Sequence, residues 1–204
     1  MANKIVTYKV QLKDDTKKGA KSVENSITKL GKTVGPLVAA SFGAAAIKAA
    51  TDAYIRQENA IAQLDQRLKS TGATVGFTSK ELQGMAASLQ KVTTFGDEAT
   101  IEMQGLLLTF TQIRGPIFQG AQEAILNVAQ AMGTDLKSAA IQVGKALNDP
   151  KGQLSALSRS GIQFNDVQKE QIKLMQEAGD IAGAQTIILK ELETQFGGAA
   201  RAAR

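Results

Sequence analysis

The sequence contains no cysteine, histidine or tryptophan, and it has only three prolines among 204 residues. Without cysteine the chain can form no disulfide, no zinc–thiolate site and no thiol nucleophile. Without histidine it lacks the most common general base and a preferred ligand of transition metals. Any catalysis would therefore depend on Asp, Glu, Lys, Ser or Tyr.

Long apolar runs are also missing. The longest uncharged run, Thr33 to Ile47, has fifteen residues, whereas a bilayer-spanning helix needs about 20. The first residues alternate polar and apolar side chains, which is not the pattern of a secretory signal. Residues 34–55 are mostly apolar but are interrupted by Lys48 and Asp52, so a membrane-active role for this stretch stays open as an alternative.

Positive charge is present in excess, and it lies near the N-terminus. The formal net charge is +5, and residues 1–34 hold eight lysines against Asp14, Asp15 and Glu24. The simpler interpretation is a solvated helix face, and the alternative is contact with an acidic protein surface or, more weakly, with nucleic acid. Tyr8 is the one aromatic residue among these lysines, so a base-stacking platform is not predicted.

The N-terminal segment has the patterns of a short strand followed by a helix. Val6, Tyr8, Val10 and Leu12 alternate with polar residues, as in a half-buried strand. Apolar residues then recur at heptad spacing, at Ala20, Val23, Ile27, Leu30 and Val34. A lone strand needs a partner, so we expect assembly contacts with a second copy or another protein at Val6, Tyr8, Val10, Leu12, Val23, Ile27 and Leu30. "ATVGF" at 73–77 and "GIQF" at 161–164 are weaker strand candidates.

Each proline follows a residue suited to begin a helix. The pairs are Gly35-Pro36, Gly115-Pro116 and Asp149-Pro150. Gly and Asp are accepted at the N-cap, and Pro is favoured at the first helical position. Asp149 is therefore interpreted as the cap of a helix over 150–159, which ends at Ser160-Gly161. Asp180 is interpreted in the same way as the cap of a last helix.

Caps and apolar stripes predict many short helices after one long one. The long Ala-rich helix is expected from Pro36 to about Ser70, and a capping-box pattern at Thr78 and Glu81 begins the next. Further helices are expected from residue 97, and over 116–132, 135–148, 165–178 and 181–196. The fold class is mainly α: a multi-helix array with a long N-terminal helix, preceded by one short β-strand. We expect a basic arm at 1–34, the long helix at 35–72 and a compact helical domain at 73–204.

Several short motifs fail as signs of chemistry. "GKT" at 31–33 lacks the first glycine of a phosphate loop and lies within a helical pattern. Ser26–Lys29 and Ser88–Lys91 match Ser-x-x-Lys without its companion motifs. Asp97, Glu98 and Glu102 could attract a cation, but acidic residues are also favoured at a helix N-terminus. We predict no catalytic, metal or cofactor site.

The C-terminal half resembles a conserved region of bacteriophage tail tape-measure proteins. The resemblance covers about 97–204 and depends on a set of landmarks. These are Ala146 to Pro150, Ala156-Leu157, Arg159, Gly161 to Phe164, Gln168 and Gln171, Gly179-Asp180, Ala184-Gln185, and Glu191 to Gly198. Gly152 follows Asp-Pro one residue earlier than the family pattern has it.

The resemblance implies a structural protein inside the tail tube of the virion, whose length sets the length of the tail. It implies assembly in the host cytoplasm with tail assembly chaperones, contacts with tail tube and tail tip proteins, self-association, and exit from the tube ahead of DNA. A contact with the host membrane during ejection stays an open alternative. Family members are generally much longer than 204 residues, so a fragment or a short member is expected.

Two other functions compete with this expectation. One is a membrane-active helical protein that uses residues 34–55. The other is a small helical hydrolase, which the missing His and Cys argue against.

Overall fold

A computed structural model describes residues 44–204, and this part of the chain is helical without any strand. The prediction of a mainly α fold is confirmed there. The strand predicted at residues 6–12 and the rest of the basic arm lie outside the described residues. By its contacts the chain divides into two units, residues 1–58 and residues 59–204, and each is considered by itself.

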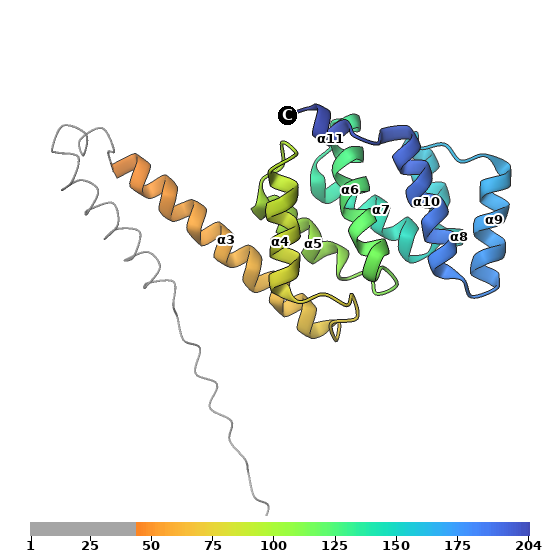
Figure 1. Ribbon diagram of the computed structural model, residues 1–204, viewed down its shortest axis with the longest axis horizontal. Coiled ribbons are helices and arrows are strands. Elements are labelled where there is room, and N and C mark those ends of the chain that lie inside the picture. Colours follow the sequence, from red (N-terminus) through yellow and green to blue (C-terminus); the bar gives the residue numbers. More distant parts are fainter. Residues whose placement is uncertain (1–43) are drawn as a thin grey trace, which may run out of the picture. The chain divides into compact units, whose positions relative to one another are not determined.

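The helices follow one another with short connections (Figure 1). They are α3 (Ala44–Ser70), α4 (Ser79–Gln90), α5 (Asp97–Leu107), α6 (Gly115–Met132), α7 (Leu136–Asn148), α8 (Pro150–Arg159), α9 (Asp166–Glu177), α10 (Ile181–Phe196) and α11 (Ala199–Ala202). Most of these bounds lie within a residue or two of those expected from caps and stripes, which is the usual precision of a helix end.

The unit of residues 59–204 has one main core, and α6 lies near its centre. Helix α6 packs against α5, α7, α10 and α11, while α8 packs against α7, α9 and α10. Its stripe of Phe118, Ala121, Ile125 and Val128 is almost fully buried, at spacings of three and four residues. Burial of these side chains is the main stabilising contribution to the unit.

The C-terminal part of α3 belongs to this unit. Ala60, Leu64 and Leu68 are buried in the main core, and Leu64 is completely inaccessible to solvent. The compact unit therefore begins at Asn59, whereas composition and helix length suggested residue 73. The division at 34/35 lies outside the described residues and stays a prediction.

Local capping explains where the helices begin. The hydroxyl of Thr78 accepts a hydrogen bond from the Glu81 N–H, and the Glu81 carboxylate accepts one from the Thr78 N–H at 2.8 Å. This confirms the capping box expected from the sequence. Asn165 and Gln168 form a second capping box at the start of α9.

The two weaker strand candidates are wrong. Residues 73–77 form turns after α3, and residues 161–164 form the loop between α8 and α9. Their apolar side chains fill the core beneath these connections: Val75, Ile162 and Phe164 are all buried. An apolar residue in a loop gives the same local signal as one in a short strand, so the pattern alone could not separate the two.

A short helix follows the last one expected. Helix α10 ends at Phe196, next to Gly197-Gly198 as predicted, and α11 then returns the chain to α6. Ala200 packs with Leu89 and Leu126 in a small second cluster, and its N–H donates to Asn127 Oδ1 at 3.0 Å.

Within residues 44–204, no helix is both long and apolar enough to cross a membrane. The membrane-active alternative was based on residues 34–55, of which residues 34–43 lie outside that range.

Candidate functional site

The corner between α7 and α8 joins four segments of the chain. Asp149 is both the C-cap of α7 and the N-cap of α8. Its Oδ1 accepts a hydrogen bond from the Gly152 N–H at 3.1 Å. The same oxygen accepts from Gln176 Nε2 of α9 at 3.0 Å. Asn148 Oδ1 accepts from the Gln112 N–H at 3.2 Å. One half-buried turn therefore holds both the loop before α6 and the end of α9.

Two further contacts hold the end of α9 to this corner. Gln176 Oε1 accepts from the Lys151 N–H at 2.6 Å, and Lys151 Nζ lies 2.7 Å from Glu177 Oε1. The hydrogen bond and charge of Lys151 lower the pKa of the Glu177 carboxyl below its usual value. Both charged side chains are about half exposed, so this pair contributes little to stability by itself.

A buried glutamine links α10 to the same region from inside. Gln185 is 2% exposed, and its Nε2 donates to the carbonyl oxygens of Gln112 and Leu147 at 2.9 and 2.8 Å. Both acceptors lie at the end of a helix or in a loop, where carbonyl groups lack partners within the helix. Loss of this amide would leave the carbonyl oxygen of the buried Leu147 without this donor, which is costly.

Two glycines allow the aspartate caps. At both Gly152 and Gly183, a Cβ atom would collide with the carboxylate of the capping residue, Asp149 or Asp180. Asp180 Oδ1 accepts from the Gly183 N–H at 2.8 Å, just as Asp149 does from Gly152. The early position of Gly152 after Asp-Pro therefore has a local reason: it is the third residue after the cap.

The remaining corner residues are placed as follows. Gly161 follows α8 with φ of 93°, a conformation that glycine adopts without strain. Helix α6 begins one residue earlier than expected, because Arg114 is at the N-cap, while Gly115 has φ of 49° and Pro116 lies in the first turn. Gly35, Pro36 and the seven residues expected to make assembly contacts lie outside the described residues.

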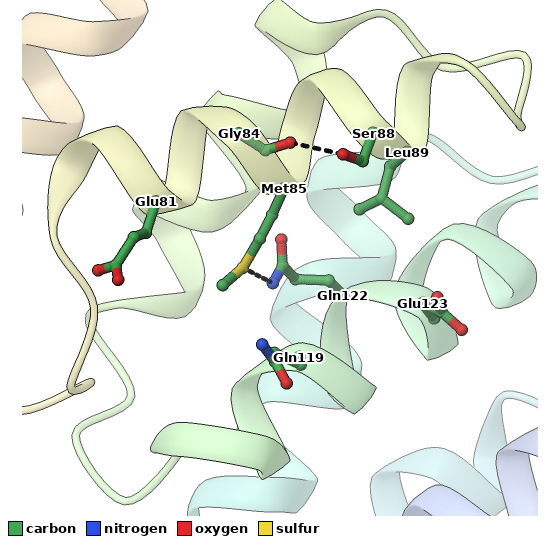
Figure 2. Close-up of a pocket in the computed structure, with 8 residues that line it drawn as sticks. All are labelled: Glu81, Gly84, Met85, Ser88, Leu89, Gln119, Gln122 and Glu123. Carbon is green, nitrogen blue, oxygen red and sulfur yellow. Dashed lines mark hydrogen bonds between the residues drawn. The ribbon is translucent and has the colours of Figure 1, made fainter.

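A groove of about 490 Å³ lies between α4 and α6 (Figure 2). Figure 2 shows Met85 and Gln122 meeting across it, with Gln122 Nε2 at 3.5 Å from Met85 Sδ. The groove is open beside Gly84, where a Cβ atom would meet nothing within 4 Å. The other lining residues are Glu81, Ser88, Leu89, Gln119 and Glu123.

The floor of this groove is held by a pair of buried glutamines. Gln104 Nε2 donates to Gln122 Oε1 at 2.7 Å and to the Leu82 carbonyl oxygen at 2.8 Å. Gln104 Oε1 has no partner among the described residues. A buried acceptor without a partner carries a desolvation cost, so this amide contributes less to the contact between α4, α5 and α6 than a fully satisfied one would.

The groove lacks the arrangement needed for acid–base chemistry. The Glu81 carboxylate is engaged with both donors of Thr78, and Glu123 pairs with Arg201 at 3.0 Å. The other polar lining groups are amides and a hydroxyl, which do not ionise near neutral pH. Residues 44–204 also contain no group of three acidic or other metal-binding side chains placed to hold an ion.

Sequence reasoning did not single out Gln104 or Gln122, and it named Gln185 only as part of the Ala184-Gln185 landmark of the family resemblance. A faint sign of burial exists for two of the three glutamines. Gln122 lies beside the apolar stripe of α6, and Gln185 lies beside that of α10. A polar residue next to a buried stripe is normally exposed, so its burial depends on partners that are distant in sequence.

The sequence matches a family model described as "Prophage tail length tape measure protein" over residues 10–173. The match includes the landmarks from Ala146 to Gln171 and ends within α9, before those that begin at Gly179. No curated protein and no solved structure matched the chain. The family model covers most of the chain, and the landmarks of the resemblance all lie in the helical part that the structure describes. This chain therefore belongs to the prophage tail length tape measure protein family.

Proposed function

We propose that the chain is a structural component of a phage tail, that it lies inside the tail tube, and that it takes part in setting tail length, in tail assembly and in DNA ejection. The observation that supports this role is the family match over residues 10–173.

Within this role, residues 97–198 are proposed to be a docking or holding unit, separate from the measuring segment. A ruler built from helix gains about 1.5 Å per residue only where the helix is uninterrupted. The longest helix in this region is α6 with 18 residues, about 27 Å. The short helices are held together by buried side chains and by the α7–α8 corner. Tail length would then be encoded outside this region.

The partners follow from the same role and are proposed with it. They are tail tube and tail tip proteins, tail assembly chaperones before the tube polymerises, and further copies of the chain. The location is the phage tail of the virion, assembled in the host cytoplasm.

Deletion of residues 165–178 from a prophage that encodes the chain tests this division. The deletion removes α9 together with Ile172, which is 1% exposed and packed in the main core. Loss of such a side chain costs about 2–5 kcal/mol, so the unit should unfold and electron microscopy should show no tails. Substitution of the exposed Lys169 by alanine is the control and should leave tails intact.

A different result would change the interpretation. Intact tails that are shorter by about 20 Å, the helical rise of the deleted residues, would show that this segment is itself part of the ruler. Normal tails of unchanged length would contradict the proposed docking role of the unit.

A further inference from the structure

Helix α11 covers one end of the groove between α4 and α6. Leu89 and Glu123 line the open part of this groove (Figure 2). The same two residues also line the space beneath α11, together with Ala200 and Arg201 of α11 itself. Only about 10 Å³ of free space remains there, which is barely enough for one water molecule. The groove is therefore closed at this end by a segment of the same chain.

The surface beneath α11 is separate from the main core and is partly polar. Ala200 packs with Leu89 and Leu126 in the small second cluster. Asn127 is 7% exposed, and its Oδ1 accepts a hydrogen bond from the Ala200 N–H at 3.0 Å. Thr93, which is 6% exposed, lines the same space. Because amide and hydroxyl groups can bind water instead, exposing this surface costs less than exposing an equal area of the main core.

Two adjacent glycines join α11 to α10. Gly198 has φ of 79°, in the left-handed region, which glycine adopts without strain. A Cβ atom at Gly197 would collide with the carbonyl oxygen of Glu193. Because glycine has a wide range of allowed φ and ψ, a rotation at this pair can lift α11 while α10 stays packed against α6, α8 and α9.

The charges of the groove indicate which kind of segment it accepts. Its charged lining residues are Glu81 and Glu123, although the chain has a net charge of +5. Arg201 Nη2 lies 3.0 Å from Glu123 Oε1. Arg204 Nη1 donates to the carbonyl oxygen of Gln90 at 2.7 Å. Gln90 is the last residue of α4, where carbonyl groups without helical partners favour a cation.

We propose that the α4–α6 groove binds short basic helices, that α11 is the occupant supplied by the chain itself, and that a partner segment of the same chemistry displaces it. That chemistry is a small apolar residue followed by arginine within one helical turn, as in Ala200-Arg201. Displacement joins the surface beneath α11 to the open part of the groove, which gives one longer acidic site. This inference does not depend on the proposed role in the tail.

Thiol labelling measures the release of α11, because the chain has no cysteine of its own. Thr93→Cys places a thiol beneath α11. Thr100→Cys is the matched control: Thr100 is 0% exposed, does not line the space beneath α11, and like Thr93 donates to the carbonyl oxygen four residues earlier. Deletion of residues 199–204 should raise the labelling rate of Thr93→Cys several-fold and leave that of Thr100→Cys unchanged.

Hydrogen exchange in the full chain gives an independent measurement. The Ala200 amide should exchange several-fold faster than the Ile125 amide in the middle of α6, because it needs only a local opening. Dilute urea should hardly change the exchange rate of Ala200, since little surface is exposed by lifting α11. The exchange rate of Ile125 should rise with urea, since it requires unfolding of the whole unit.

A synthetic peptide tests the binding chemistry. The acetylated peptide FGGAARAAR, the sequence of residues 196–204, is added at millimolar concentration to the chain that lacks residues 199–204. It should slow the labelling of Thr93→Cys several-fold. The peptide with glutamate in place of both arginines should not slow it, and Glu123→Gln in the protein should weaken the protection by the arginine peptide.

Four results would overturn the proposal. The first is a labelling rate of Thr93→Cys that is the same with and without residues 199–204. The second is a rise in the labelling of Thr100→Cys as well, which would show that the fold needs α11. The third is an Ala200 amide that exchanges as slowly, and with the same urea dependence, as that of Ile125. The fourth is equal protection, or none, from the arginine and glutamate peptides.

Discussion

At the scale of single residues, two helical glycines show that the same residue type can have opposite roles. Gly144 of α7 is buried, and a Cβ atom there would lie against three ring atoms of Phe110, with Cδ2 at 2.6 Å and Cζ at 3.0 Å. Gly84 of α4 is exposed beside the groove, and a Cβ atom there would meet nothing. Helical glycines suggest close packing from sequence alone, but that interpretation holds for Gly144 and not for Gly84.

Alanine at these two positions should therefore change stability in opposite directions. Gly84→Ala removes the helix penalty of glycine and should raise the free energy of unfolding by about 0.5–1 kcal/mol. Gly144→Ala gains the same propensity but forces Phe110 aside, and should lower the free energy of unfolding by about 1–2 kcal/mol. Urea unfolding followed by circular dichroism measures both.

The contact with Phe110 can be checked directly. Phe110→Leu should cost less in the Gly144→Ala background than in the wild type, because the ring is already displaced. Additive effects of the two substitutions would show that the cost at Gly144 has another origin.

The burial of three glutamines, and the partners of their amides, could not be predicted from the sequence. Gln185 reaches Gln112, which lies 73 residues away, and Gln104 reaches Gln122, 18 residues away. Gln122 and Gln185 lie beside apolar stripes, but so does the exposed Gln119 of the same groove, which directly follows Phe118. Their role depends on which helices become neighbours, and single-sequence patterns do not contain that information.

At the scale of secondary-structure elements, the helix starts were predictable because capping is local. The capping residue and its partner are three positions apart at Thr78, Asn165 and Asp180. The loop at 161–164 and helix α11 were not predicted. Ile162 and Phe164 fill a core to which helices distant in the sequence contribute. The short α11 packs against α6, where the Ala200 N–H donates to Asn127 Oδ1, a contact that is far away in the sequence.

The capping box of α4 predicts a dependence of stability on pH. Hydrogen bonds from the Thr78 backbone, and then from its hydroxyl, lower the pKa of the Glu81 carboxyl below its ordinary value of 4.5. A carboxyl with a lower pKa in the folded state stabilises the fold above its unfolded pKa, and this contribution is lost as pH falls through the folded value.

Glu81→Gln should reduce the sensitivity to acid. Glutamine keeps a hydrogen-bond acceptor but does not titrate, so the free energy of unfolding of the variant should change less between about pH 6 and about pH 3 than that of the wild type. Glu58→Gln, at an exposed glutamate of α3, is the control. Equal loss of stability in the wild type and Glu81→Gln would show that other carboxyl groups dominate the acid transition.

At the scale of the whole molecule, the basic segment at 1–34 is predicted to be an assembly element that the helical unit does not need for folding. Removal of residues 1–34 should leave the helical circular dichroism signal of residues 78–198 unchanged, because the core of residues 59–204 is made within that unit. The same deletion should weaken self-association or partner binding, measured by light scattering. Unchanged oligomeric mass with partner binding intact would contradict the assembly role.

The packing of α10 on α6 affects the order in which the chain acquires its structure. Most other contacts join helices that are adjacent in sequence, such as α4 with α5, α6 with α7, and α7 with α8, and local contacts of this kind form quickly. Helix α6 is different, because it packs against α10, which comes much later in the chain and buries Ala184, Ile188 and Leu192 in the same core. During synthesis one face of α6 therefore remains uncovered until α10 has left the ribosome. The nascent protein is most exposed to aggregation or to capture by a chaperone in that interval.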